Sequence, residues 1–167
     1  MSKEKLKVET NGNELITTRK FNAPRKLVFE AHSDCKHLMN WWGPREWPLS
    51  YCKMDFRVGG TWHYCLKGPE GMGESWGKAI YKEIKAPEKL YYEDYFSDKD
   101  GNLNKEMPST LVKTHFEEVG GATIVKSTAT YRSKEDLQKV IDMGMTAGIE
   151  QTLDRLDEYM EKLVAEK

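Results

Sequence analysis

The chain has 167 residues, a length that fits one domain with a substantial core. Its 26 basic and 27 acidic residues nearly cancel, which argues against nucleic acid or an anionic membrane as a partner. The N-terminal stretch MSKEKLKVETNGNE lacks the apolar core of a signal peptide, and no run approaches the roughly 20 apolar residues that span a bilayer. We therefore expect a cytoplasmic protein.

Residues 1–13 carry almost no apolar side chains and end in the turn signal NGN, so we expect a flexible tail or a short edge strand there. The single domain is expected to span residues 14–167. ELITTRKF has the β-branched character of a strand. NAPRKLVFEAHS then predicts a helix with Pro24 in its first turn, followed by a second short helix over about residues 34–42.

The stretch from Leu49 to Tyr131 has the pattern of strands separated by turns. YCKMDFRV and TWHYCLK both alternate in polarity, and Gly59-Gly60 between them permits a hairpin. Further strands are predicted over residues 76–84, 90–96, 111–117 and 123–131, with turn signals such as SDKDGN between them. Together these segments predict a long antiparallel meander.

The last segment predicts one amphipathic helix from Ser133 to about Ala165, with apolar residues on one stripe at spacings of three and four. Gly144 and Gly148 lie on that stripe, and each glycine inside a helix costs about 1 kcal/mol relative to alanine. One explanation is close packing of the helix on the sheet. The other is a gap in the side chains that leaves a ligand cavity beneath the helix.

The cysteines and histidines give little support to a metal or redox site. Cys35, Cys52 and Cys65 are odd in number and show no CxxC spacing, so all three are expected to be reduced thiols. His32 and His37 lie beside Cys35 in HSDCKH, but no fourth ligand follows at a zinc-like spacing. We predict no metal and no cofactor.

No motif for hydrolysis, nucleotide binding or zinc proteolysis is present, and we predict no catalytic residue. The strand phases of His63 and His115 are opposite to those of the neighbouring aromatic residues, so both are expected to face water. Glu83 is the one acidic residue that we retain as a candidate for acid/base chemistry, against the simpler reading of a solvated charge at a strand end.

Several segments occur in the order that a known family shows: APRKLVFEAHSD, HLMNWWGP, CKMDFRVGGTWHYCLKGPEG, KAIYKEIKAPEKLYYED and GMTAGIEQTLDRLDEYM. Over about residues 14–163 the chain resembles the START-like (SRPBCC) superfamily, in its bacterial branch homologous to the activator of the heat-shock chaperone ATPase. The resemblance implies an α+β helix-grip fold, in which a curved antiparallel sheet of about six or seven strands surrounds a long C-terminal helix. Two short helices are expected after the first strand.

Superfamily members bind lipids, flavonoids or polyketides between helix and sheet, and a few are cyclases or hydrolases, so the resemblance implies a small apolar or aromatic ligand for this chain. A chaperone or other protein is the alternative partner, and the sequence favours a binding protein over an enzyme. Lys126 stands where relatives often carry an aliphatic residue, and its amine would lie near the cavity mouth. The residues expected to line the cavity are Trp41, Trp42, Trp62, Tyr64, Tyr92, Phe116, Met145, Gly148, Ile149 and Thr152.

The adjacent tryptophans of HLMNWWGP are expected to have different roles. Leu38, Trp41 and Trp42 share one face of the second short helix, which closes one end of the grip. One indole then belongs to the core. The other lies at the rim, where it borders either the cavity entrance or a partner surface.

Overall fold

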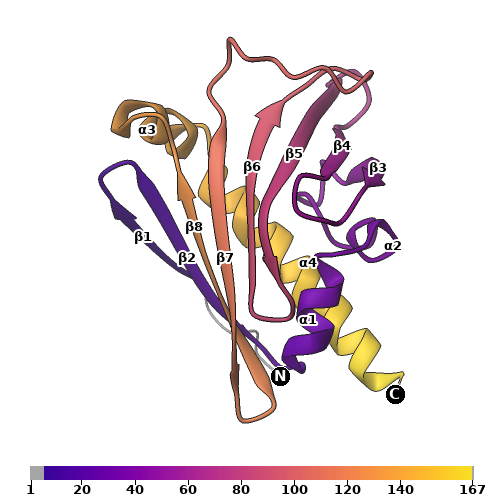
Figure 1. The fold of residues 1–167 in the computed structure, drawn as a ribbon. Coiled ribbons are helices and arrows are strands. Elements are labelled where there is room, and N and C mark those ends of the chain that lie inside the picture. Colours follow the sequence, from indigo (N-terminus) through magenta and orange to yellow (C-terminus); the bar gives the residue numbers. More distant parts are fainter. Residues whose placement is uncertain (1–5, 167) are drawn as a thin grey trace.

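The computed structural model describes residues 6–166 (Figure 1), so the first five residues of the expected N-terminal tail lie outside the described part. The elements are β1 (Lys7–Asn11), β2 (Glu14–Phe21), α1 (Arg25–Ala31), α2 (Cys35–Leu38), β3 (Leu49–Met54), β4 (Thr61–Lys67), β5 (Glu74–Lys85), β6 (Lys89–Phe96), β7 (Thr110–Val119), β8 (Ala122–Thr130), α3 (Lys134–Asp142) and α4 (Met145–Ala165).

The strands form one antiparallel sheet of eight strands in the order β1-β2-β8-β7-β6-β5-β4-β3, and not the six or seven expected. The additional strand is β1, whose residues 7–11 pair with β2 as an exposed edge strand. Residues 7–11 therefore form the short edge strand that was one of the two expectations for the N-terminal stretch. All side chains of β1 are exposed, and backbone hydrogen bonds hold the strand in place, so its sequence needs no alternation of apolar residues.

The helices occupy one face of the sheet. Figure 1 shows α4 crossing that face, with α1 and α2 beside the C-terminal part of α4. In α1, Leu27, Val28, Phe29 and Ala31 are buried. This arrangement agrees with the helix-grip architecture implied by the resemblance.

The single C-terminal helix that the apolar stripe predicts is divided into α3 and α4. Gly144 separates them with a φ of +90°, a left-handed conformation that glycine adopts without the clash of a Cβ atom. The apolar periodicity continues across the break, which is why it did not reveal the change of direction. Gly144 is therefore a helix boundary and not a glycine inside a helix.

The second helix is shorter than expected, because α2 ends at Leu38 and residues 39–41 form turns. Trp41 is nevertheless fully buried, and its indole Nε1 donates a hydrogen bond to the carbonyl oxygen of Ala31 at 3.0 Å. This bond satisfies the polar atom of a buried indole. Trp41 is thus the core member of the tryptophan pair.

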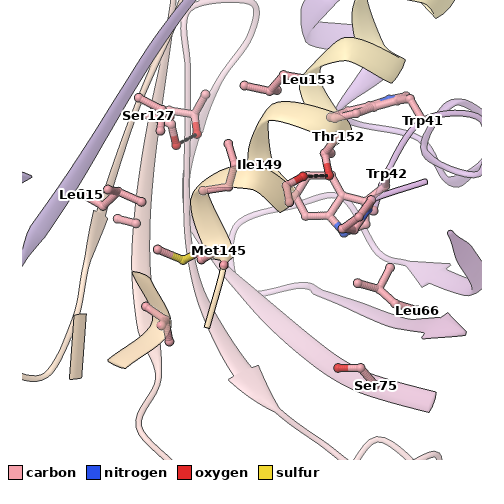
Figure 2. Close-up of a pocket in the computed structure, with 18 of the residues that line it drawn as sticks. Leu15, Trp41, Trp42, Leu66, Ser75, Ser127, Met145, Ile149, Thr152 and Leu153 are labelled. Atoms are coloured by element: carbon pink, nitrogen blue, oxygen red, sulfur yellow. Dashed lines mark hydrogen bonds between the residues drawn. The ribbon is translucent and has the colours of Figure 1, made fainter. Parts of the chain in front are cut away.

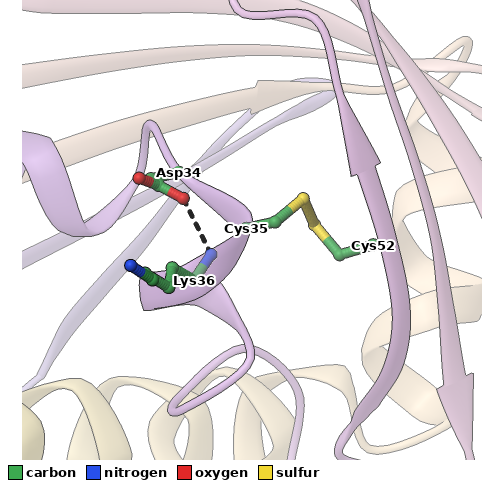
Figure 3. The surroundings of a disulfide bond; sticks show 4 residues. All are labelled: Asp34, Cys35, Lys36 and Cys52. Atoms are coloured by element: carbon green, nitrogen blue, oxygen red, sulfur yellow. Dashed lines mark hydrogen bonds between the residues drawn. A yellow bond between two sulfur atoms is a disulfide. The ribbon is translucent and has the colours of Figure 1, made fainter.

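The expectation of three reduced thiols is wrong for two of them. Cys35 of α2 and Cys52 of β3 form a disulfide (Figure 3), whereas Cys65 is free and buried. The partners are separated by 17 residues and share no local motif. They meet because the fold lays α2 beside the edge of the sheet, a proximity that cysteine number and spacing could not indicate.

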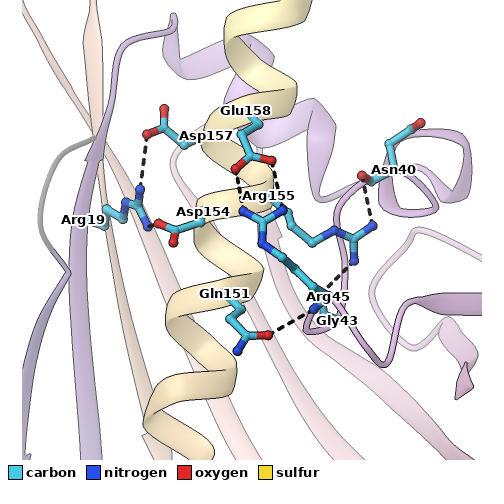
Figure 4. Close-up of polar contacts among 9 residues, drawn as sticks. All are labelled: Arg19, Asn40, Gly43, Arg45, Gln151, Asp154, Arg155, Asp157 and Glu158. Carbon is cyan, nitrogen blue, oxygen red and sulfur yellow. Dashed lines mark hydrogen bonds and ion pairs between the residues drawn. The ribbon is translucent and has the colours of Figure 1, made fainter. Parts of the chain in front are cut away.

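A buried ion-pair cluster joins β2 to α4 (Figure 4). The Arg19 guanidinium contacts Asp154 at 2.7 Å and Asp157 at 3.2 Å, and only 1% of the Arg19 side chain is exposed. A buried cation needs such partners, because it has lost its hydration.

Removing the cation from this cluster should strongly destabilise the fold. We expect Arg19→Ala to lower the free energy of unfolding by about 3–5 kcal/mol, since it leaves the Asp157 carboxylate buried without its guanidinium. Arg57→Ala, which removes an exposed pair with Asp55, should cost at most about 1 kcal/mol. Urea denaturation measures both values, and equal losses would show that the buried cluster has no special role.

Candidate functional site

A cavity of about 650 Å³ lies between α4 and the inner face of the sheet (Figure 2). Strand residues form one wall, α3, α4 and the Gly144 break form another, and the segment after α2 closes one side. The lining residues are Leu15, Thr17, His32, Trp41, Trp42, Gly43, Pro44, Leu66, Ser75, Tyr92, Thr114, Val125, Ser127, Ala129, Tyr131, Val140, Met143, Gly144, Met145, Gly148, Ile149, Thr152 and Leu153.

The space around Gly148 distinguishes the two explanations of the glycine pair. A Cβ atom added at Gly148 would meet only the Cγ of Pro44, at an ordinary contact distance of 3.4 Å. Close packing on the sheet would have placed sheet atoms against this position. The geometry therefore favours the cavity explanation for Gly148, whereas Gly144 is explained by its backbone conformation.

Most of the residues that the sequence assigns to the cavity do line it. Trp42 is half-buried at its edge, with its ring centroid 5.3 Å from that of Trp41. Figure 2 shows Trp42 near Thr152, and Ile149 facing the sheet. The predicted residues that line the cavity are Trp41, Trp42, Tyr92, Met145, Gly148, Ile149 and Thr152.

The other three predicted residues lie outside the lining. Trp62 is buried and packs its ring 4.9 Å from Trp42 and 4.5 Å from Tyr64. Phe116 packs 5.1 Å from the ring of His32. Trp62, Tyr64 and Phe116 therefore belong to the hydrophobic core, where Trp62 and Phe116 pack against lining residues. A strand residue on the inner face can fill the core or border the cavity, and alternation does not distinguish the two.

His32 is a cavity residue that the sequence suggested only as a metal ligand. Its Nδ1 lies 2.8 Å from the carbonyl oxygen of Val28, and its ring packs 4.8 Å from Trp41. Burial lowers the pKa of His32 to about 4, so the imidazole is neutral at neutral pH. Its place four residues after the buried Val28, on the same side of α1, was the signal that could have identified it.

A carboxyl group on the inner side of the sheet was also missed. The Tyr64 hydroxyl donates to both carboxylate oxygens of Asp94 at 2.8 Å. Burial raises the pKa of Asp94 to about 6, although the hydrogen bond from Tyr64 acts in the opposite direction. Burial also raises the pKa of Tyr64 well above its usual value, so the phenol stays a donor. Neither residue lines the cavity, and each satisfies the polar atoms of the other.

The expectation that His63 faces water is wrong. His63 is only 7% exposed, because the turn that follows β6 covers it and the Asp98 carbonyl oxygen lies 2.9 Å from its Nε2. The outer sheet face is therefore partly covered at this point. His115 is exposed, as expected, with its Nε2 3.0 Å from the Tyr91 hydroxyl.

Two other candidates from the sequence lie away from the cavity. Glu83 forms an ion pair with Lys89 at 3.0 Å, and both side chains are partly exposed. Lys126 is exposed on the outer face, since its neighbour Val125 points into the cavity and strand residues alternate. Within residues 6–166, no group of three or more His, Cys, Asp or Glu side chains could hold a metal ion. No helix in this range has the length and apolarity needed to cross a membrane.

One comparison identifies a family, and its match covers most of the chain. Residues 22–161 match the family model described as Activator of Hsp90 ATPase homolog 1-like protein. A search among curated proteins finds no significant match.

Solved structures give similarity over nearly the whole chain. A protein from Staphylococcus epidermidis is 32% identical, with 93% of each chain covered and a TM-score of 0.82. A protein from Arthrobacter aurescens is 28% identical, with 93% of this chain and 91% of that chain covered and a TM-score of 0.85. Protein Ms6760 from Mycobacterium smegmatis is 29% identical, with 93% and 95% covered and a TM-score of 0.82.

The raised pKa of Asp94 predicts a pH-dependent stability. A folded-state pKa of about 6, above the ordinary 3.8, means that the folded protein binds the proton more tightly than the unfolded chain. The burial cost of the carboxylate is therefore fully present above about pH 6 and disappears below about pH 4. Asp94→Asn, which keeps an acceptor for Tyr64, should melt at a higher temperature than the wild type at pH 7.5.

Melting curves between pH 3.5 and 8 test this expectation. The advantage of Asp94→Asn should shrink as the pH falls through this window. Asp100→Asn, in the exposed turn after β6, serves as the control and should show no such trend. A constant difference between Asp94→Asn and the wild type at every pH would contradict the assignment.

Proposed function

We propose that this chain, which belongs to the family of Activator of Hsp90 ATPase homolog 1-like proteins, binds a small apolar or aromatic molecule between α4 and the sheet. The family lies within the START-like superfamily, and its fold is compatible with a ligand-binding or a co-chaperone-like role. The observation that carries the proposal is the open space beneath Gly148, in the half of α4 that borders the cavity.

The size and lining of the cavity support this proposal. Its volume of about 650 Å³ lies within the roughly 300–1,000 Å³ of typical small-molecule sites. Trp42, Tyr92, Met145 and Ile149 offer aromatic and flexible apolar surface, which suits a lipid, polyketide or flavonoid-like molecule.

The lining chemistry supports binding over catalysis. Among the lining residues within 6–166 there is no Asp, Glu, Lys or Cys, and His32 is held neutral by burial. Glu83, the acid/base candidate from the sequence, is paired with Lys89 away from the cavity. A carrier or sensor therefore fits these residues better than a cyclase or hydrolase.

We propose a cytoplasmic location on the sequence evidence, and the Cys35–Cys52 bond would then depend on the local redox state.

A co-chaperone-like role is the second candidate. An aromatic pair on the outer face favours it, since Tyr51 is 39% exposed and its ring lies 5.3 Å from that of Trp76. If this role is correct, the protein should change the ATPase rate of a purified heat-shock chaperone, and Tyr51→Ser combined with Trp76→Ser should abolish the effect. An unchanged ATPase rate with the wild-type protein would remove this candidate.

Filling the cavity from Gly148 tests the ligand-binding proposal. We expect Gly148→Leu to hold or raise the melting temperature, because the side chain enters open space and helix propensity improves by roughly 0.7–1 kcal/mol. Binding of the apolar fluorescent probe N-phenyl-1-naphthylamine should be lost. Gly148→Ala, whose methyl group makes only an ordinary contact, should keep probe binding.

Two measurements decide the outcome. Thermal melting reports packing, and a loss of about 1–3 kcal/mol in Gly148→Leu would indicate that the space is already filled. Fluorescence titration reports binding, and equal probe affinity in wild type and Gly148→Leu would place the probe elsewhere and reject the cavity as the site.

A further inference from the structure

Three hydroxyl groups form a row across the inner face of the sheet. Thr17 of β2 is paired in register with Ser127 of β8, and Ser127 is paired with Thr114 of β7. All three line the cavity, and Thr17 and Thr114 are only 8% and 5% exposed. Because paired residues of neighbouring strands point to the same face, the hydroxyls stand side by side.

The row has unused hydrogen-bonding capacity. Thr114 Oγ1 and Ser127 Oγ are 3.1 Å apart, and either hydroxyl can be the donor. Each hydroxyl carries one donor and two acceptor sites, so this single bond leaves one of the two protons and further lone pairs available. Thr17 adds a third hydroxyl beside them. Such a row can donate to a carbonyl oxygen and can both donate to and accept from a hydroxyl.

Apolar side chains border most of the row. Leu15 and Ala129 pair on one side of it, and on the other side Val125 pairs with Arg19, whose guanidinium is engaged by Asp154 and Asp157. Ile149 faces the row from α4, as Figure 2 shows for Ser127. Polar atoms in an apolar wall recognise a polar atom of the ligand strongly, because burial without a partner is costly.

The same surroundings disfavour a charged ligand. His32 is the one lining residue within 6–166 that could carry a positive charge, and burial lowers its pKa to about 4. The Asp94 carboxylate lies outside the lining and is engaged by Tyr64. The Arg19 guanidinium beside the row is already engaged by Asp154 and Asp157, so an ionised ligand would lose its hydration without gaining a counter-charge.

We propose that Thr17, Ser127 and Thr114 form the polar subsite of the cavity, and that the ligand is an uncharged, largely apolar molecule with one hydroxyl or carbonyl group at its buried end. The inference rests on the proposed ligand-binding function. It adds a requirement that the apolar lining alone does not impose.

Three probes that share the biphenyl skeleton test the subsite proposal separately from the ligand-binding proposal. Biphenyl, 4-hydroxybiphenyl and biphenyl-4-carboxylate are titrated in competition with N-phenyl-1-naphthylamine on the full chain. We expect 4-hydroxybiphenyl to bind about threefold to tenfold more tightly than biphenyl, as one net hydrogen bond would give. The carboxylate should bind more weakly than biphenyl.

Variants test whether the three hydroxyl groups cause the preference for 4-hydroxybiphenyl over biphenyl. Thr17→Val and Thr114→Val with Ser127→Ala should equalise the affinities for biphenyl and 4-hydroxybiphenyl. Thr18→Val with Thr128→Val makes similar changes at neighbouring positions on the opposite face of the strands, and should keep the preference. Melting curves confirm folding, and the three single variants replace the triple variant if it does not fold.

The outcomes are distinct. If biphenyl binds but the hydroxyl gives no advantage, or if the advantage survives in the triple variant and all single variants, the subsite proposal is overturned and the ligand-binding function stands. If neither the biphenyl probes nor N-phenyl-1-naphthylamine bind, the ligand-binding function fails, and the subsite proposal fails with it.

Discussion

The α4 helix is attached to the sheet through its C-terminal half, and this attachment determines where the cavity can form. The buried residues of α4, Leu156, Asp157 and Met160, all lie in the C-terminal half, where Arg19 also engages Asp154 and Asp157. The N-terminal half, from Met145 to Leu153, has no buried residue and borders the cavity. A helix anchored at one half can hold its other half above an open space without collapsing onto the sheet.

The same helix also fixes the cavity edge that carries the tryptophan pair, through Arg155, whose contacts with Asn40 and Gly43 are drawn in Figure 4. Arg155 donates to the carbonyl oxygens of Asn40 at 3.3 Å, Trp42 at 3.2 Å and Gly43 at 2.8 Å. These acceptors follow the short helix α2, where the backbone leaves carbonyl groups without helical partners. A charged donor therefore replaces the helical turns that the sequence suggested for this segment, and it holds Trp42 at the cavity edge.

How far the sequence could predict the molecule depends on whether a feature is periodic or comes from contacts between distant segments. Strand alternation correctly predicted that Trp62 and Tyr64 lie on the inner face of the sheet. It could not distinguish inner-face residues that fill the core from those that border the cavity. The Cys35–Cys52 bond and the Tyr64–Asp94 pair depend on which elements become neighbours, and no local pattern records that. Gly148 was recognisable because a glycine inside an apolar stripe conflicts with helix propensity.

The hydroxyl row explains how this cavity could be selective with so few polar atoms. Apolar burial contributes roughly 25 cal/mol per Å², and any ligand of suitable shape gains it, so the apolar lining alone discriminates poorly. Thr17, Ser127 and Thr114 come from three strands, and the sequence shows them as ordinary strand residues. Register alone brings them together, in a wall where a ligand without a matching group would leave polar atoms unpaired. Selectivity in such a site comes from the cost of a missing hydrogen bond and not from attraction between charges.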